Sequence, residues 1–306
     1  MHTVDMQTNV GKTLRKVGYK TQRVGLELEY EDCRISRLTQ KDVPLWMFAT
    51  DHSLRNSGIE FVSKPLPRKS IRTQIDRMLE VAKLAECNPN KRCGYHVHVN
   101  CTHLTWNELY CFVVYYTLLE PLLFKHFAPG REVSHFCVPT WTNIALTENL
   151  YHDGQVLRTG IPIPWKSTAE NGCTLTDMMK AVTASKYGPT RLEMLSTPKY
   201  GAMNFNSLNR FGTLEFRQAP SSLDPEFLEK WALLLLDIQA EAIKYNEPTD
   251  IMLEYDANGI VTLCERVGFF PTKEADDLDQ EDAVDAAAII AGHIPVDWKE
   301  LKWEMK

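Results

Sequence analysis

The amino-acid sequence predicts an α+β protein in which helices pack on one face of a curved antiparallel β-sheet. The strand prediction rests on three stretches that alternate polar and apolar residues with the two-residue period of a half-buried strand: 25–30, 94–99 and 212–217. The helix prediction rests on three segments with helical spacing or a strongly apolar composition: 70–85, 105–127 and 224–245. A chain of 306 residues with 44% hydrophobic side chains can bury a full core in one large domain.

Each alternating stretch carries two polar residues two positions apart: Glu27 and Glu29, His96 and His98, and Glu215 and Arg217. Side chains two apart on a strand project from the same face. The residues that alternate with them should face the core: Leu26, Leu28, Tyr95, Val97, Val99, Leu214 and Phe216. If the three strands share one sheet, the other face collects carboxylates, imidazoles and a guanidinium. Such a face is unusual unless a charged ligand binds there.

The first half of the chain yields the following elements in order. Residues 1–21 are polar and are predicted to form a flexible N-terminal segment. A strand is expected at about 21–33, an apolar segment at 45–49, and a strand carrying Glu60 at 59–63 after a turn at 56–58. A helix is expected at 70–85, capped by Ser70.

The second half begins with a helix at 105–127, with Thr105 as its N-cap, Glu108 at the capping-box position, and a kink or split at Pro121. Residues 128–185 read as an irregular insertion with one short helix at 175–184. Two adjacent strands follow at 200–208 and 211–218, with the turn at 209–210.

The last predicted helix of the 22–247 domain spans 224–245, with Asp224 as its N-cap and Pro225 as its first residue. Residues 248–306 are predicted to form a C-terminal helical, partly acidic extension. This extension contains an acidic stretch at 274–285, expected to be a solvated helix face, and a helix at 283–291.

Composition narrows the class of protein. The formal charge is −6, from 34 basic and 40 acidic residues, and no basic stripe dominates a segment, so nucleic acid is not an expected partner. The eight cysteines include no C-x-x-C pair, and residues 1–20 lack the apolar region of a signal peptide. No apolar run approaches membrane-spanning length. These features predict a cytoplasmic protein with reduced thiols and no membrane partner.

The histidines and carboxylates suggest a metal site. Glu27 and Glu29 alone would be read as two surface carboxylates, although like charges on one strand face repel unless a divalent cation binds them. His96 and His98 lie on one face, and Gly94 permits a close backbone approach. Two histidines and a glutamate form a known catalytic zinc set, so a zinc-dependent hydrolase is one alternative.

The number of carboxylates favours another metal. Four of them accompany the predicted strands, more than one zinc ion can use: Glu27, Glu29, Glu60 and Glu215. Hard oxygen ligands suit Mg²⁺ or Mn²⁺, which typically bridge to phosphate oxygens. The planar guanidinium of Arg217 can bind phosphate or carboxylate through two parallel hydrogen bonds, although Glu215 and Arg217 alone could be a surface ion pair. Together these residues predict a metal-rich phosphoryl-transfer site on an antiparallel sheet that has no P-loop.

Four motifs, in this order, resemble the amidoligase family, whose members are carboxylate–amine ligases with a glutamine-synthetase-like catalytic fold. The motifs are Gly25-x-Glu27-x-Glu29, Asp51-x-Ser53 with Gly58-x-Glu60-Phe61-Val62-Ser63, Gly94-x-His96-Val97-His98-Val99, and Gly212-Thr213-x-Glu215-Phe216-Arg217. The resemblance covers roughly 22–219 and implies a sheet of the glutamine-synthetase-like type. The segment from Lys199 to Asn204 also resembles the family's basic-aromatic segment, with Lys199 where an arginine is usual.

The resemblance implies a role for each site residue. Divalent metals would be held by Glu27, Glu29, Glu60, His96 and Glu215. His98 would approach the ATP phosphates, and Arg217 would stabilise the charge of the transferring γ-phosphoryl group. Lys199 and Asn204 would bind substrate. Asp51 is a candidate base or amine binder, or alternatively a turn-capping aspartate.

The implied function is an ATP- and Mg²⁺- or Mn²⁺-dependent ligase that forms an amide or isopeptide bond through an acyl phosphate. Its expected substrates are amino-acid or peptide-like carboxylates and amines. Two alternatives stay open at this point: the zinc-dependent hydrolase, and a non-catalytic protein that binds nucleotide or metal without turnover.

Overall fold

The structure is a computed structural model that describes residues 6–16, 18–38, 41, 43–51, 53–143, 146–147, 149–151, 200–270 and 280–292. The predicted helix at 175–184, most of the predicted insertion at 128–185, and Lys199 lie outside them.

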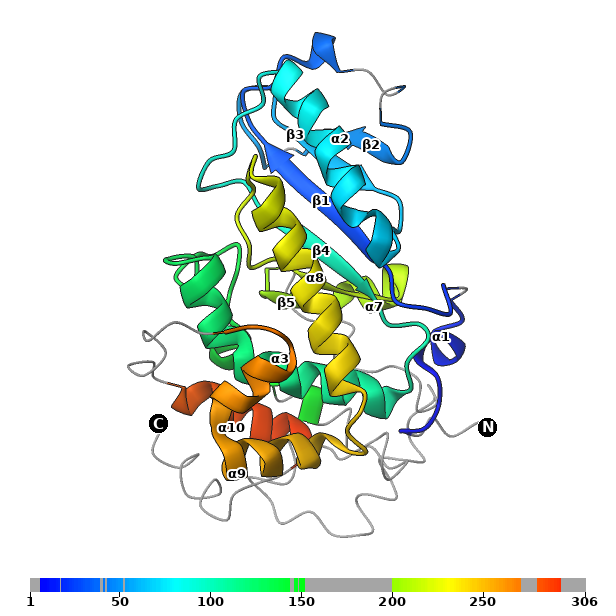
Figure 1. The fold of residues 1–306 in the computed structure, drawn as a ribbon, viewed down its shortest axis with the longest axis vertical. Helices are drawn as coiled ribbons and strands as arrows, with labels where there is room; N and C mark the ends of the chain where they lie inside the picture. Colours follow the sequence, from blue (N-terminus) through cyan, green and yellow to red (C-terminus); the bar gives the residue numbers. More distant parts are fainter. Residues whose placement is uncertain are drawn as a thin grey trace, which may run out of the picture.

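One antiparallel sheet organises the fold (Figure 1). It has six strands in the order β2-β3-β1-β4-β6-β5, and each neighbouring pair runs antiparallel. The strands are β1 (Val24–Tyr30), β2 (Trp46–Ala49), β3 (Ile59–Ser63), β4 (Tyr95–Asn100), β5 (Met203–Asn204) and β6 (Thr213–Phe216). The α+β class and the antiparallel sheet are therefore confirmed.

Helices cover one face of this sheet. In Figure 1, α2 (Ile71–Leu84) and α8 (Pro225–Ala242) lie side by side in front of the strands. The long helix α3 (Trp106–Phe127) contacts α8, and both α9 (Pro248–Arg266) and α10 (Glu281–Ala291) pack against α3. The short elements are α1 (Val10–Thr13), α7 (Asn206–Phe211), η1 (Ile35–Arg37), η2 (Arg68–Ser70) and η3 (Thr140–Thr142).

The core lies between the sheet and these helices. Leu26, Leu28, Val97 and Leu214 are completely buried within one hydrophobic cluster. Phe216 of β6 packs against two aromatic rings of α3, with centroids 4.7 Å from Tyr116 and 5.5 Å from Phe112. The apolar side chains of the alternating strands thus face the core, as their period predicts.

Two helix starts agree with the predicted caps. The Thr105 side chain accepts a hydrogen bond from Glu108 N and the Glu108 carboxylate accepts one from Thr105 N, which completes the capping box. Asp224 accepts from Glu226 N at the start of α8, where Pro225 is the first residue. These bonds satisfy amide groups that have no partner inside the helix. Helix α3 is not split at Pro121 but continues to Phe127.

Two local predictions differ from the structure. Ser70 lies at the N-cap position of α2, as predicted, but its side chain does not cap the helix, because its hydroxyl donates to Pro67 O in the 3-10 turn η2. The connection between β5 and β6 is not a turn at 209–210 but the short helix α7. That helix ends at Gly212, whose φ of 75° is the left-handed conformation typical of a helix C-terminus.

The chain before β1 is bonded to the connection between β4 and α3. Val10 N donates to Leu104 O, and Trp106 N donates to Thr8 O. The helix expected at 283–291 corresponds to α10. In the described part of the chain, no helix combines the length and apolar character needed to cross a membrane.

Candidate functional site

The strand register brings the polar residues of four strands to one face of the sheet. Glu27 of β1 lies opposite His96 of β4, and His98 of β4 lies opposite Glu215 of β6. On the other side of β1, Glu29 lies opposite Glu60 of β3. Directly opposed residues of an antiparallel pair share a face, so these side chains are neighbours.

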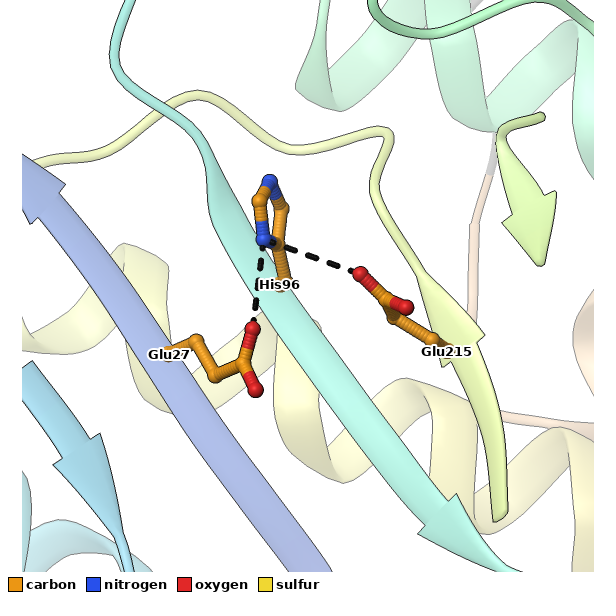
Figure 2. A group of neighbouring side chains, drawn as sticks. All are labelled: Glu27, His96 and Glu215. Carbon is orange, nitrogen blue, oxygen red and sulfur yellow. Dashed lines mark ion pairs between the residues drawn. The ribbon is translucent and has the colours of Figure 1, made fainter. Parts of the chain in front are cut away.

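The first candidate metal group consists of Glu27, His96 and Glu215 (Figure 2). His96 Nδ1 lies 3.5 Å from Glu27 Oε2 and 3.7 Å from Glu215 Oε1. One ligand atom from each residue lies within 4.8 Å of the others. Figure 2 shows the three side chains converging from three neighbouring strands.

The second candidate group consists of Glu29, Glu60 and His96. His96 Nε2 lies 3.7 Å from Glu29 Oε1, so the two ring nitrogens of His96 face different groups. A neutral imidazole has one acceptor nitrogen and one N–H donor. His96 can therefore bind a metal in one group while it donates to a carboxylate of the other.

His98 lies beside the first group. Its Nε2 is 3.0 Å from Glu27 Oε1, and its Nδ1 is 3.0 Å from Thr213 Oγ1. The ring of Phe211 meets it edge-on, with centroids 5.8 Å apart. Among the described residues, neither candidate group contains both histidines.

Glu215 is fixed by several neighbours. It forms an ion pair with Arg217, whose Nη1 also lies 3.4 Å from His96 Nδ1. The other oxygen of Glu215, Oε2, accepts hydrogen bonds from Asn204 Nδ2 at 2.7 Å and Ser207 Oγ at 3.0 Å. Asn204, the predicted substrate binder, thus holds Glu215 in this structure, and a direct contact with substrate stays a prediction.

The polar face is buried, unlike an ordinary charged surface. His96 is 3% exposed, Glu215 5%, Glu29 6% and Arg217 9%. Glu29 is therefore not a surface carboxylate, Glu27 is half-buried, and Glu215 and Arg217 are not a surface ion pair. Burying this many charges raises the free energy of the folded state unless they are paired or bind a counter-ion.

Burial and neighbouring charges shift the pKa values of the site. Burial and the charges of Glu27, Glu29 and Asp51 raise the pKa of Glu60 to about 8. Burial also opposes the ionisation of Glu27, but its contacts with His96 and His98 outweigh this effect and hold the pKa of Glu27 below its ordinary value. The crowding of the carboxylates thus favours the protonated form of Glu60.

The pKa values of two further site residues are shifted in opposite directions. Burial raises the pKa of Glu215, but the charges of His98 and Arg217 outweigh it, so the pKa lies below its ordinary value. Burial alone would lower the pKa of His98, but its close contact with Glu27 raises the pKa above its ordinary value. His98 therefore carries positive charge more readily than a free histidine.

Gly94 allows the backbone to approach His96, as predicted. Gly94 N donates to Glu29 Oε2 at 2.6 Å. A Cβ atom at position 94 would lie 2.4 Å from His96 Nε2 and 3.3 Å from Glu29 Oε2. Only glycine leaves room for both side chains here.

Asp51 lies in the same region. Its Oδ1 accepts a hydrogen bond from Ser53 N at 2.7 Å, which is the turn-capping arrangement. The residue also lines a small cavity together with Glu29 and Arg217. Both interpretations of Asp51 are thus compatible with its position.

Two cavities flank the candidate metal groups. The larger, of about 350 Å³, is lined by residues that include Glu27, His98, Tyr19, Arg23 and Phe211. The smaller, of about 50 Å³, is lined by residues that include Glu29, His96, Arg131 and Arg217. The sequence indicated neither the loop residues Tyr19 and Arg131 nor Ser207 and Phe211 in α7, because no periodic pattern marks them.

Comparisons with known proteins agree with the geometry. A family model described as "Putative amidoligase enzyme" matches residues 10–239, from α1 into α8, a span that contains every site residue named above. No curated protein matches the chain. Because the match spans most of the sequence, the chain belongs to the amidoligase family.

Proposed function

We propose that this protein is an ATP- and Mg²⁺- or Mn²⁺-dependent ligase that joins a carboxylate to an amine through an acyl phosphate, on a sheet of the glutamine-synthetase-like type. The observation that carries the proposal is the pair of carboxylate groups that share His96 on a buried face, with Arg217 beside them. Membership of the amidoligase family supports the formation of an amide bond.

The donor set fits hard divalent cations. Each candidate group offers two carboxylates and one imidazole, and the raised pKa of Glu60 reflects the negative charge gathered there. A bound cation would neutralise that charge and polarise phosphate oxygens. A zinc site built on both His96 and His98 is less well supported, because His98 instead lies between Glu27 and Thr213.

The larger cavity suits a nucleotide. Tyr19 and Phe211 line this cavity. His98 and Glu27 line it too, and Glu27 also belongs to the first candidate metal group. A base held against the apolar walls would direct its phosphates toward His98. The imidazolium form of His98, favoured by its raised pKa, supplies positive charge there.

The chemistry has two steps. In the first, an oxygen of the substrate carboxylate attacks the γ-phosphorus of ATP, the bond to the bridging oxygen breaks, and ADP leaves. Arg217 would stabilise the charge on the transferring group. In the second, the amine attacks the acyl carbon, inorganic phosphate leaves, and the amine gives up a proton. Asp51, in the smaller cavity, is the proposed acceptor of that proton.

The direct test measures phosphate release from ATP across a panel of amino acids and peptides. We expect release that requires Mg²⁺ or Mn²⁺, depends on both a carboxylate and an amine, and survives mild removal of zinc. Nucleotide binding without release under any pairing would favour the non-catalytic alternative. One tightly bound zinc whose removal inactivates the protein would favour the hydrolase.

A matched pair of variants separates the site from the scaffold. Glu29→Gln should abolish metal-dependent ATP binding while the fold is retained, because glutamine has nearly the same shape and still offers Gly94 N an acceptor. Glu80→Gln, on the exposed side of α2, is the control and should bind ATP normally. An unfolded Glu29→Gln protein would indicate a structural role instead.

A further inference from the structure

The smaller cavity is lined by three arginines, Arg92, Arg131 and Arg217. Two of them have a carboxylate partner. Arg92 Nε lies 3.5 Å from Glu31 Oε1, and Arg217 is paired with Glu215. Their positive charge is therefore largely balanced within the protein.

Arg131 differs from the other two. Within the described residues, no carboxylate lies within ion-pair distance of its guanidinium. Its Nη1 donates to Lys91 O and Cys93 O at 3.3 Å each, and these carbonyl oxygens carry no net charge. The neighbouring Cys137 thiol is neutral, because burial raises its pKa to about 12.

Two of the arginines that line this cavity each have a buried N–H group without an acceptor in the described part of the protein: Arg131 Nε and Arg217 Nε. Arg217 is itself 9% exposed, so water does not readily replace the missing acceptor. Buried polar groups are normally hydrogen-bonded, and an exception calls for an explanation. A guanidinium edge that lacks an acceptor is complementary to a carboxylate or phosphate oxygen.

The shape and charge of the cavity narrow the choice of anion. A volume of about 50 Å³ admits a group of carboxylate size. Phe136 and Tyr200 also line it, about half exposed, with their rings edge to face at 5.5 Å, so they form an apolar rim. Glu29 and Asp51 on the same wall would repel a phosphate dianion more strongly than a monoanionic carboxylate.

We propose that Arg131 binds a second carboxylate of the acyl substrate, while the reacting carboxylate lies beside Arg217. This inference rests on the proposed ligase function and gives the acyl substrate a chemical class. The substrate is a dicarboxylic acid, free or as an acidic residue of a peptide. The chain after it would leave the cavity past Phe136 and Tyr200.

The test measures binding without turnover. The full-length protein with Mg²⁺ and no ATP is titrated calorimetrically with succinate, glutarate and adipate, and with butyrate as the monocarboxylate. We expect at least one dicarboxylate to bind about tenfold or more tightly than butyrate, the scale of one charge-assisted contact. Arg131→Met should remove this preference.

Three controls exclude a purely structural effect. Arg131→Lys keeps the charge but not the Nε–H, and should recover part of the dicarboxylate preference. Arg77→Met, on the exposed side of α2, should behave as the unchanged protein does. A non-hydrolysable ATP analogue should bind all variants equally. A loss of analogue binding or of melting temperature in Arg131→Met would show that Arg131 only holds the 91–93 loop.

The inference and the proposed function can fail separately. Equal affinity for butyrate and every dicarboxylate, no dicarboxylate binding, or an unchanged preference in Arg131→Met would overturn the inference even if ATP is consumed. A dicarboxylate preference that depends on Arg131, in a protein that never releases phosphate from ATP, would overturn the proposed function instead.

Discussion

Gly94 lies directly against the ring of His96: a Cβ atom at position 94 would come within 2.4 Å of His96 Nε2. His96 is the residue that both candidate metal groups share, so the absence of a side chain at position 94 affects both groups.

Gly94→Ala should displace the His96 ring and weaken metal binding by about 10–100-fold, the scale reported for disturbed support of metal ligands. The fold should survive, because the clash involves the end of a side chain. Titration with Mn²⁺, followed by electron paramagnetic resonance, gives the affinity. Gly25→Ala is the control, since its Cβ would meet His98 Cβ at an ordinary 3.5 Å. Equal Mn²⁺ affinity in both variants would contradict this view of His96.

Arg217→Lys should lower kcat by roughly 10²–10³, the scale seen when one preorganised transition-state donor is lost. Lysine keeps the charge but lacks the planar pair of parallel N–H donors that a guanidinium presents to phosphate oxygens. ATP affinity should change little, because the contact strengthens as charge is redistributed in the transition state. Steady-state kinetics and ATP-analogue binding measure the two effects. Arg68→Lys, in the exposed pair with Asp237, is the matched control. A higher KM for the carboxylate substrate alone, at unchanged kcat, would show that Arg217 binds that substrate and does not stabilise the transition state.

Glu120 should make stability depend on pH. Complete burial within α3 raises its pKa from 4.5 to about 8, against the opposing bonds from Thr140. The folded state therefore holds this proton more tightly than the unfolded state. The stabilisation is fully present below pH 4.5 and is lost as the pH rises through about 8, by roughly 1.4 kcal/mol per unit in this window.

Glu120→Gln should remove this slope while retaining an acceptor for Thr140 N. Urea unfolding at a series of pH values, for both proteins in parallel, isolates the difference. Identical slopes would show that another group controls the dependence.

Leu28→Ala should reduce the free energy of unfolding by about 2–5 kcal/mol, and Val97→Ala by somewhat less, because both side chains are completely buried in the core. Chemical denaturation gives both values. Glu27→Gln, from the neighbouring position of β1, provides the comparison. A larger loss in Glu27→Gln than in Leu28→Ala would mean that the two faces of β1 have been inverted.

The faces of the strands could be predicted from the sequence because the two-residue period is a local property. Leu28 and Val97 therefore fell on the core side, and Glu29 and His96 on the other. The pairing of Glu27 with His96 could not be predicted, since register depends on contacts between distant segments. The resemblance to the amidoligase family supplied the predicted role of each site residue, which the local patterns do not give.

The misses also have physical causes. Ser70 is a good cap by residue type, but the chain already turns at 68–70 and its hydroxyl is engaged. Helix α7 was mistaken for the ends of two strands and the turn at 209–210, although Gly212 just after Phe211 is a helix-stop signal. Arg131 lies in a loop whose place beside Arg217 depends on tertiary packing alone.

The packing of α9 and α10 on α3 determines how much of the chain is needed to keep α3 buried. The family match ends at residue 239 and includes the whole proposed site, yet α3 is buried on nearly every side. Part of that burial comes from beyond the match, where Tyr115 Oη donates to Leu263 O at 2.7 Å and α10 covers a second side. The segment that the family model matches and the unit of folding therefore have different boundaries. A chain trimmed to the former would expose an apolar helix to solvent.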